Sequence, residues 1–356
     1  MMKTKKRLLL IVMILVISSS LLAAGCGNKE KSANKEPDQA APAQKYTMKL
    51  GTVEAVESVK HQACVMFKEK VEKATNGNLT VELYPASQLG NARAQVEAVQ
   101  MNTQQATLVP NSNYVSFFPP ASITDMPYLF PSREITYKVM DGKVGEEYFK
   151  AYESTGIHVL TMWESGFKQL TGNFEITKPE DFQGKKMRVM ENPVLIAQFK
   201  ALGASAIPIN YSETYNSLQQ KVVDGQENPM MSIYDMKFQE VQKCMAISDH
   251  GWLPLVFGIN KDWWDDLPQE YQAALKQSAD ECRDWLRQAI AKEEREAIIP
   301  AFEKSGMKII VLTQEQKDAF AAKIKEPTQN ALIGMMDDQG KVLLDKLTTE
   351  VENASR

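Results

Sequence analysis

The sequence predicts an α/β protein made of two α/β units that enclose a cleft, with one long helix lying along both units. Three observations support this prediction. Strand-like and helix-like patterns alternate over residues 46–109, and they alternate again over residues 187–223. Residues 268–302 then carry a helical pattern with Pro300 as the one internal proline. A helix of about 30 residues there would be near 45 Å long, which is enough to lie along two domains.

The first unit is identified by regular apolar spacing. Residues 46–52 and 79–84 alternate apolar and polar side chains, as half-buried strands do. Ala63, Phe67 and Val71 stand four residues apart, which places them on one face of a helix. The expected order is a strand at 46–52, a helix at 59–75, a strand at 79–84, a helix at 91–101 and a strand at 107–109. Strands separated by helices predict a parallel sheet that the helices cover.

The second unit follows an irregular stretch, 112–131, that is rich in proline and aromatic residues. Short helices at 133–140 and 144–152 and a strand at 158–163 come next. The expected order is then an extended segment at 169–171, a strand at 187–190, a helix at 194–201, a strand at 206–209 and a helix at 212–223. The remaining elements are strands at 244–247, 253–259 and 308–312 and helices at 314–333 and 340–351, with 253–259 expected to return to the first unit.

One stretch in the second unit, LQQKVVDGQENP at 218–229, combines a helix end with a polar exit. Gly225 is expected to end the helix in the left-handed conformation. Pro229 pushes Asn228 toward extended geometry, and a carboxamide offers both a donor and an acceptor to a small polar ligand. An ordinary loop between a helix and a strand is the alternative interpretation.

The composition fits a globular protein and argues against nucleic acid as a partner. The 356 residues are 44% hydrophobic and 24% charged, and the length allows two domains. The formal net charge is -4, and loss of the four cations in the first 25 residues would leave a chain near -8. An acidic surface repels the phosphate backbone of nucleic acids.

The N-terminus has the pattern of an export signal followed by a tether. A basic start, Lys5–Arg7, precedes an apolar run, Leu8–Ile17, that is too short to span a bilayer comfortably. Small residues then precede Cys26, in a pattern similar to a bacterial lipobox, where Cys26 would be lipidated after removal of residues 1–25. A plain cleaved signal with a chance cysteine is the alternative. Residues 26–45 are poor in apolar side chains, as flexible linkers are.

No catalytic or metal-binding pattern is present in the sequence. The three histidines are His61, His158 and His250, and no GxSxG, HExxH or P-loop motif accompanies them. The cysteines after Cys26 lack CxxC spacing, so neither a disulfide framework nor a zinc site is supported, although one pair could still bond across the fold. The sequence therefore favours a binding protein without a cofactor over an enzyme.

Several segments in a fixed order resemble one protein family. They are YPASQLG at 84–90, DMPYLF at 125–130, KKMRVM at 185–190, FKALGA at 199–204, YSETYNSLQQKVVDGQENP at 211–229, KFQEVQK at 237–243 and INKDWWDDLP at 259–268. From residue 46 to the early 300s, the chain resembles the solute-binding proteins of TRAP (tripartite ATP-independent periplasmic) transporters, of the DctP type.

The resemblance implies a class II periplasmic-binding-protein fold. Domain I would comprise 46–165 with 253–290 returning, and domain II would comprise 166–252 with 291–353 returning. The implied function is a monomeric receptor, lipid-anchored to the outer face of the cytoplasmic membrane. It would capture a small organic acid and deliver it to the small and large subunits of a permease driven by an ion gradient. A sensor with the same fold that partners a membrane signalling protein is the alternative, and a secreted hydrolase is a third, weaker hypothesis.

The resemblance also implies ligand contacts. Arg188 matches an arginine that grips the ligand carboxylate, since a planar guanidinium donates two parallel hydrogen bonds. Asn228 matches the asparagine of the QENP motif, and Tyr211 matches a ligand-facing aromatic residue. Lys168 stands where many relatives carry a second arginine. The neighbouring Glu164 would meet a ligand amine or hydroxyl or would pair with Lys168, and the pair is favoured.

Five further residues are weaker candidates for the ligand site. Asn111 and Ser112 follow the third strand, and such sheets bind ligands at the carboxyl ends of their strands. Trp163 and Trp252 would either wall the pocket or lie in the core. Ser58 stands where relatives often have a His-Pro step after the first strand.

Overall fold

A computed structural model describes residues Gln44–Arg356 of the chain. The predicted signal segment, Cys26 and all but the last two residues of the predicted tether lie outside the described residues. Within Gln44–Arg356, no helix is both long enough and apolar enough to cross a membrane.

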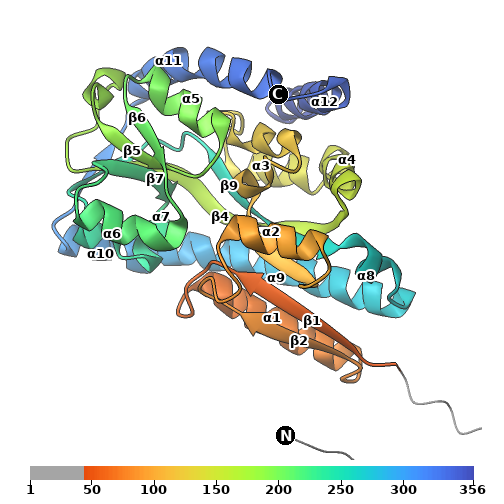
Figure 1. Cartoon of the computed structure of the whole chain (residues 1–356). Helices are drawn as coiled ribbons and strands as arrows, with labels where there is room; N and C mark the ends of the chain where they lie inside the picture. The colour runs from red at the N-terminus through yellow and green to blue at the C-terminus, as the bar shows by residue number, and fades with distance from the viewer. Residues whose placement is uncertain (1–43) are drawn as a thin grey trace, which may run out of the picture. The chain divides into compact units, whose positions relative to one another are not determined.

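Strands and helices alternate along most of the described chain (Figure 1). The strands are β1 (Tyr46–Thr52), β2 (Leu79–Tyr84), β3 (Ala106–Pro110), β4 (Ile157–Gly172), β5 (Lys186–Val189), β6 (Ser205–Pro208), β7 (Gly225–Pro229), β8 (Cys244–Ile247), β9 (Trp252–Asn260) and β10 (Lys308–Val311). The α-helices are α1 (Val59–Ala74), α2 (Ala92–Gln100), α3 (Arg133–Met140), α4 (Lys143–Ala151), α5 (Pro193–Ala201), α6 (Thr214–Gln219), α7 (Met230–Asp235), α8 (Lys261–Asp265), α9 (Gln269–Glu293), α10 (Ile299–Lys304), α11 (Gln314–Ile333) and α12 (Asp338–Ala354).

The strands form a sheet in the order β2-β1-β3-β9-β4-β7-β5-β6, with β8 and β10 joined to β4 as a branch. At one end, β1 pairs in parallel with β2 and β3, and at the other end β5 pairs in parallel with β6 and β7. The central strands run antiparallel, because β9 pairs with both β3 and β4 and β4 pairs with β7. Residues 253–259, which the sequence predicted to return to the first unit, lie in β9 and pair with both β3 and β4. The expected parallel sheet is instead mixed.

The strand β4 joins the two ends of the sheet. Residues 157–167 of β4 pair with β9, and residues 168–172 pair with β7. A register shift lies between Glu164 and Gly166, where Gly166 has a φ of 123° that favours glycine. The prediction of two separate extended segments at 158–163 and 169–171 is therefore wrong, since one strand with a bulge covers both.

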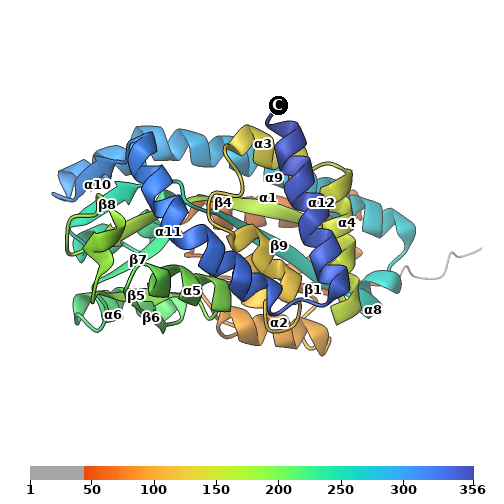
Figure 2. The same cartoon turned by 90° about the horizontal axis from the view of Figure 1, so that it is seen from above.

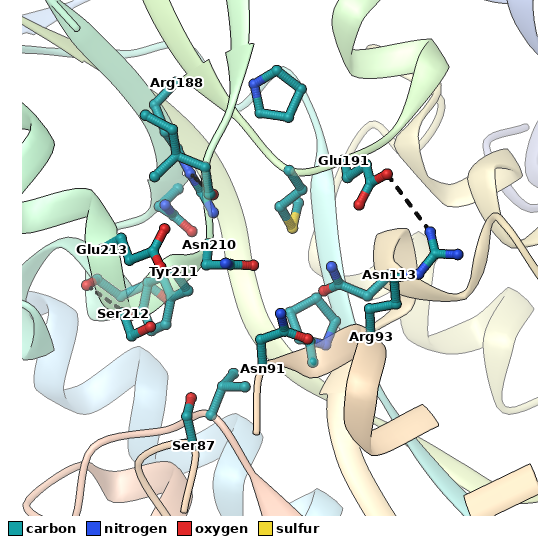
Figure 3. A pocket seen from close by; sticks show the side chains of 18 of the residues that line it. Ser87, Asn91, Arg93, Asn113, Arg188, Glu191, Asn210, Tyr211, Ser212 and Glu213 are labelled. Atoms are coloured by element: carbon teal, nitrogen blue, oxygen red, sulfur yellow. Dashed lines mark hydrogen bonds and ion pairs between the residues drawn. The ribbon is translucent and has the colours of Figure 1, made fainter. Parts of the chain in front are cut away.

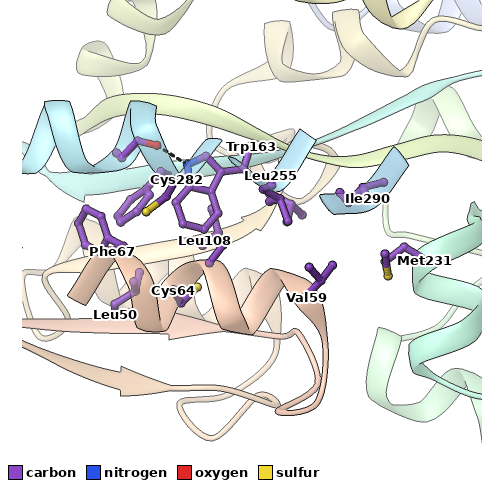
Figure 4. Close-up of a cluster of buried hydrophobic side chains, with 14 of the residues drawn as sticks. Leu50, Val59, Cys64, Phe67, Leu108, Trp163, Met231, Leu255, Cys282 and Ile290 are labelled. Carbon is purple, nitrogen blue, oxygen red and sulfur yellow. Dashed lines mark hydrogen bonds between the residues drawn. The ribbon is translucent and has the colours of Figure 1, made fainter. Parts of the chain in front are cut away.

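The predicted long helix is present, and it lies against both α1 and β4. Helix α9 runs to Glu293, continues through a π-helical segment, Glu294–Ile298, and merges with α10. The indole nitrogen of Trp163 in β4 donates to the carbonyl of Ala279 in α9, 3.0 Å away. Figure 4 shows Trp163 among the apolar side chains between α1 and α9. The long helix thus fixes the first strands to the centre of the sheet.

The closing helices α11 and α12 cover one side of the described chain (Figure 2). Helix α11 packs on α5, and α12 packs on α3 and α4. Three clusters of buried apolar side chains fill the interior, and the cysteines Cys64, Cys244 and Cys282 are buried and free. The prediction of buried thiols agrees with this arrangement.

The stretch 218–229 folds differently from the prediction. Helix α6 ends at Gln219 instead of residue 223, and Lys221 takes the left-handed conformation with a φ of 59°. Gly225 is the first residue of β7 and has no positive φ. Its role is close approach, because a Cβ there would come within 2.2 Å of the carbonyl oxygen of Thr171 in β4.

Candidate ligand-binding site

An open cavity of about 210 Å³ lies where residues from both ends of the sheet meet (Figure 3). The end of the sheet with β1 contributes side chains that follow β1 and β3 or lie at α2: Glu54, Asn91, Arg93 and Asn113. The end with β5 and β7 contributes Arg188, Glu191, Asn210, Tyr211, Asn228 and Ser232.

Arg188 is a buried cation without an acidic partner. It lies in β5, is 2% exposed, and its Nε donates to the carbonyl of Ile209 at 2.9 Å. Among residues 44–356, no carboxylate pairs with its guanidinium. Burial lowers the pKa of Arg188 to about 10, so the guanidinium still carries its charge at neutral pH. A buried charge of this kind is costly unless a ligand anion compensates it.

Asn228 and Tyr211 line the same cavity. Asn228 lies in β7 opposite Gln169 of β4, and its Nδ2 donates to Gln226 Oε1 at 2.5 Å. The hydroxyl of Tyr211 donates to the carbonyl of Ser232 at 3.1 Å. The resemblance-based residues Arg188, Asn228 and Tyr211 are thus brought together by the fold.

Lys168 does not line this cavity in the structure. It is 1% exposed, and its Nζ lies 2.9 Å from Glu227 Oε1 and 3.4 Å from Asp125 Oδ1. Glu227 also accepts a hydrogen bond from Gln198 Nε2 and bonds to His250 Nε2, each at 2.6 Å. Burial alone would raise the pKa of Glu227, but Lys168 and His250 hold it well below its usual range. The Lys168 ammonium is therefore paired with two carboxylates, those of Glu227 and Asp125.

Glu164 does not pair with Lys168, so that part of the prediction is wrong. Glu164 Oε1 accepts from Arg133 Nε at 2.8 Å, and its other oxygen accepts from the Tyr137 hydroxyl. Arg133 also pairs with Glu294 at 2.6 Å, in the π-helical segment after α9. Glu164 faces α3 because the bulge in β4 separates its register from that of Lys168.

The five weaker candidates have structural partners and do not line the cavity. Asn111 donates to the Ala121 carbonyl and to Thr124, and Ser112 donates to Asp125 at 2.7 Å. Trp163 bonds to α9, and Trp252 packs edge-on against Phe130 with ring centroids 5.4 Å apart. Ser58 caps α1 by accepting a hydrogen bond from the backbone N–H of His61 at 3.1 Å.

Several cavity residues were not predicted from the sequence as ligand contacts: Glu54, Asn91, Arg93, Asn113, Glu191, Asn210 and Ser232. Glu54 follows β1, Asn113 follows β3 and Glu191 follows β5. The rule that ligands bind beyond the carboxyl ends of strands could have found these three residues. It selected Asn111 and Ser112, which immediately precede the cavity residue Asn113 after β3.

A second cluster of buried charged side chains borders the cavity. Lys60 in α1 is fully buried, contacts the Glu54 carboxylate, lies 3.3 Å from Asp235 Oδ2 and donates to Ser232 Oγ at 3.2 Å. Burial would lower the pKa of Lys60, but Glu54 and Asp235 raise it. Since Glu54 and Ser232 line the cavity, this cluster forms part of the candidate site.

Comparison with known proteins identifies the family to which this fold and cavity belong. A sequence model described as bacterial extracellular solute-binding protein, family 7, matches residues 50–333. The chain belongs to this family. The solute-binding assignment agrees with an open cavity that contains an uncompensated buried cation.

Individual solute-binding proteins of the family match most of this chain. The C4-dicarboxylate-binding periplasmic protein of Rhodobacter capsulatus is 36% identical over 79% of this chain and 84% of its own length. The 2,3-diketo-L-gulonate-binding periplasmic protein of Escherichia coli is 34% identical over 73% of this chain and 79% of its own. A TRAP periplasmic solute-binding protein of Desulfovibrio salexigens, solved with orotic acid, superposes with a TM-score of 0.84 at 32% identity. That match covers 87% of this chain and 100% of the other.

Proposed function

We propose that this solute-binding protein captures a small organic carboxylate in the cavity at Arg188 and delivers it to the membrane permease subunits of a TRAP transporter. The supporting observation is the buried Arg188 guanidinium, which faces the cavity and has no carboxylate partner in the described chain. Two similar proteins are named for binding a C4-dicarboxylate and 2,3-diketo-L-gulonate, and a third was solved with orotic acid bound. All three ligands are carboxylates, which agrees with this proposal.

Binding would couple to closure of two domains. We place the boundary within β4 near residue 165, where the bulge lies, with β1, β2, β3 and β9 in one domain and β5, β6 and β7 in the other. A ligand that touches Arg188 from one domain and Glu54 or Asn91 from the other stabilises the closed arrangement. A charge-assisted hydrogen bond contributes about 1.5–3 kcal/mol, whereas micromolar affinity needs about 8 kcal/mol. Burial of the ligand and contacts to Asn228 and Tyr211 would supply the rest.

The cellular setting belongs to the same proposal. The chain would act as a monomer outside the cytoplasm, lipid-anchored through Cys26 to the outer face of the cytoplasmic membrane, with small and large permease subunits as partners. It would perform no catalysis, and Lys168 and Glu164 would support the site through their buried ion pairs without contacting the ligand.

A thermal-shift screen with matched ligand pairs tests the carboxylate proposal. Succinate, a sugar acid and orotate would each be compared with the corresponding neutral amide. A ligand that binds the native state stabilises it by about 2.7 kcal/mol when present at one hundred times its Kd. We expect at least one acid to raise the melting temperature and its amide to have little effect, because the amide lacks the charge that Arg188 needs. Equal shifts for acid and amide, or no shift with any carboxylate, would contradict the proposal.

A further inference from the structure

The cavity carries opposite charges at its two ends. Arg188 lies in β5, and Glu54 follows β1, with the strands β3, β9, β4 and β7 standing between them in the sheet order. Both side chains line one cavity although their strands are far apart in the sheet, so they reach it from different parts of the fold. A ligand that fills the cavity would therefore present one end to Arg188 and the other end to Glu54.

Arg188 is the cation available to a ligand carboxylate. The other arginine of the cavity, Arg93, is 42% exposed and has carboxylates beside it, because its Nε lies 3.2 Å from Glu97 Oε1 and its Nη1 lies 3.6 Å from Glu191 Oε1 (Figure 3). Lys60 lies close to the cavity, but its ammonium is paired with the carboxylates of Glu54 and Asp235. In residues 44–356, the cavity thus offers one uncompensated positive charge, at Arg188.

The end of the cavity at Glu54 has an excess of negative charge. Glu54 and Asp235 share the single ammonium of Lys60, and the three side chains are 3%, 7% and 0% exposed. Two carboxylates thus face one ammonium in a poorly solvated place, where charge interactions are strong. A second carboxylate on the ligand would meet repulsion there, whereas a hydroxyl or ammonium group would donate a hydrogen bond to Glu54.

Neutral polar groups also line the cavity. Asn91, Asn113, Asn210 and Ser212 all border the cavity and carry amide or hydroxyl groups that can donate or accept hydrogen bonds. These groups suit a polar ligand without adding a positive charge for a second carboxylate.

We infer that Glu54 determines specificity and that the site selects monocarboxylates carrying a distal hydrogen-bond donor, a hydroxyl or an ammonium, over dicarboxylates. This inference rests on the proposed carboxylate site at Arg188. It assigns Arg188 to the shared carboxylate and Glu54 to the group that distinguishes one ligand from another.

Calorimetric titration with a matched ligand series tests the inference. Succinate, γ-hydroxybutyrate and γ-aminobutyrate have the same chain length and differ at the distal group, and the corresponding five-carbon set extends the length. We expect a donor-bearing acid to bind at least about tenfold more tightly than the dicarboxylate of equal length, which corresponds to about 1.4 kcal/mol. The hydroxyl and ammonium members show which donor Glu54 prefers.

The substitution Glu54→Gln removes the charge at nearly constant shape, and Glu57→Gln on the exposed part of the same loop is its control. We expect Glu54→Gln to reduce the preference for the donor-bearing acid by about tenfold and Glu57→Gln to leave it unchanged. Circular dichroism of each variant checks that it is folded, and the selectivity of the unsubstituted protein tests the inference even if Glu54→Gln unfolds.

The possible results distinguish a failure of this inference from a failure of the proposed function. If the dicarboxylates bind as tightly as the donor-bearing acids, the inference about Glu54 is wrong while the carboxylate site stands. Unchanged selectivity in folded Glu54→Gln would also show that Glu54 does not determine specificity. If no acid of either series binds, the inference fails, and the proposed function fails with it only when the sugar acid and orotate also give no thermal shift.

Discussion

Arg188 and Lys168 are both fully buried cations on neighbouring parts of the sheet, yet their surroundings differ completely. Arg188 in β5 has a backbone carbonyl as its partner and borders the cavity. Lys168 in β4 is held by Glu227 and Asp125. The comparison shows that residue type does not decide whether a buried cation can bind a ligand, because neighbouring carboxylates can neutralise it first.

The largest loss of stability is expected when Lys168, the cation paired with carboxylates, is replaced. Lys168→Ala would leave Glu227 and Asp125 buried near each other without their shared counter-charge, and breaking a buried pair costs about 3–5 kcal/mol of stability. Urea unfolding measures this loss. Lys70→Ala is the matched control, since its pair with Glu281 is 40% and 45% exposed and exposed ion pairs contribute little to stability. Equal losses for the two variants would show that the Lys168 cluster is not a buried network.

The pH dependence of stability gives a second, smaller effect. The pKa of folded Glu227 is held well below its usual range, so at acidic pH the unfolded state takes up this proton first. The stabilising contribution of Glu227 is fully present above about pH 4.3 and declines as the pH falls below it, by about 1.4 kcal/mol per pH unit. Urea unfolding between pH 6 and pH 3 tests this expectation.

Glu227→Gln isolates this contribution from that of Asp125. Burial raises the pKa of Asp125, so its protonation works in the opposite direction, toward greater stability at low pH. The stability difference between the unsubstituted protein and Glu227→Gln should therefore shrink as the pH falls. A difference that stays constant down to pH 3 would contradict a lowered pKa at Glu227.

The smallest stability effect is expected at the uncompensated cation. Burial lowers the pKa of Arg188, and each unit of lowering corresponds to about 1.4 kcal/mol of unfavourable free energy for the charged form. The substitution Arg188→Met removes that charge and should leave the ligand-free protein as stable as before or about 1.4 kcal/mol more stable. A loss of stability comparable to that of Lys168→Ala would mean that Arg188 serves the fold as Lys168 does.

The sequence predicted most elements because their apolar spacing is regular. The bounds of β1, β2, α3 and α11 agree with the structure, since each has a clean pattern or a clear cap. The sequence did not reveal that β4 is continuous through the bulge at Gly166. A glycine after the polar residues Glu164 and Ser165 resembles the end of a strand. Helix α6 ends early because Lys221 turns left-handed, and lysine gives no local signal of that conformation.

The candidate site was predictable only in part. Arg188, Asn228 and Tyr211 could be identified through the resemblance, and the fold brings them to one cavity. The partners of Lys168 come from the loop before α3 and from β7, which are 43 and 59 residues away, so no local pattern reveals them. Burial and neighbours, which decide the role of a cation, depend on the tertiary structure.

The most direct test of the contrast between the two cations is the affinity of folded Arg188→Lys and Arg188→Ala for a carboxylate ligand, measured by isothermal titration calorimetry. The ligand would be the acid with the largest thermal shift for the unsubstituted protein. Both variants should bind at least about tenfold more weakly, because lysine keeps the charge but loses the two parallel hydrogen bonds of the guanidinium, and alanine loses both. Unchanged affinity in either folded variant would show that Arg188 does not hold the ligand carboxylate.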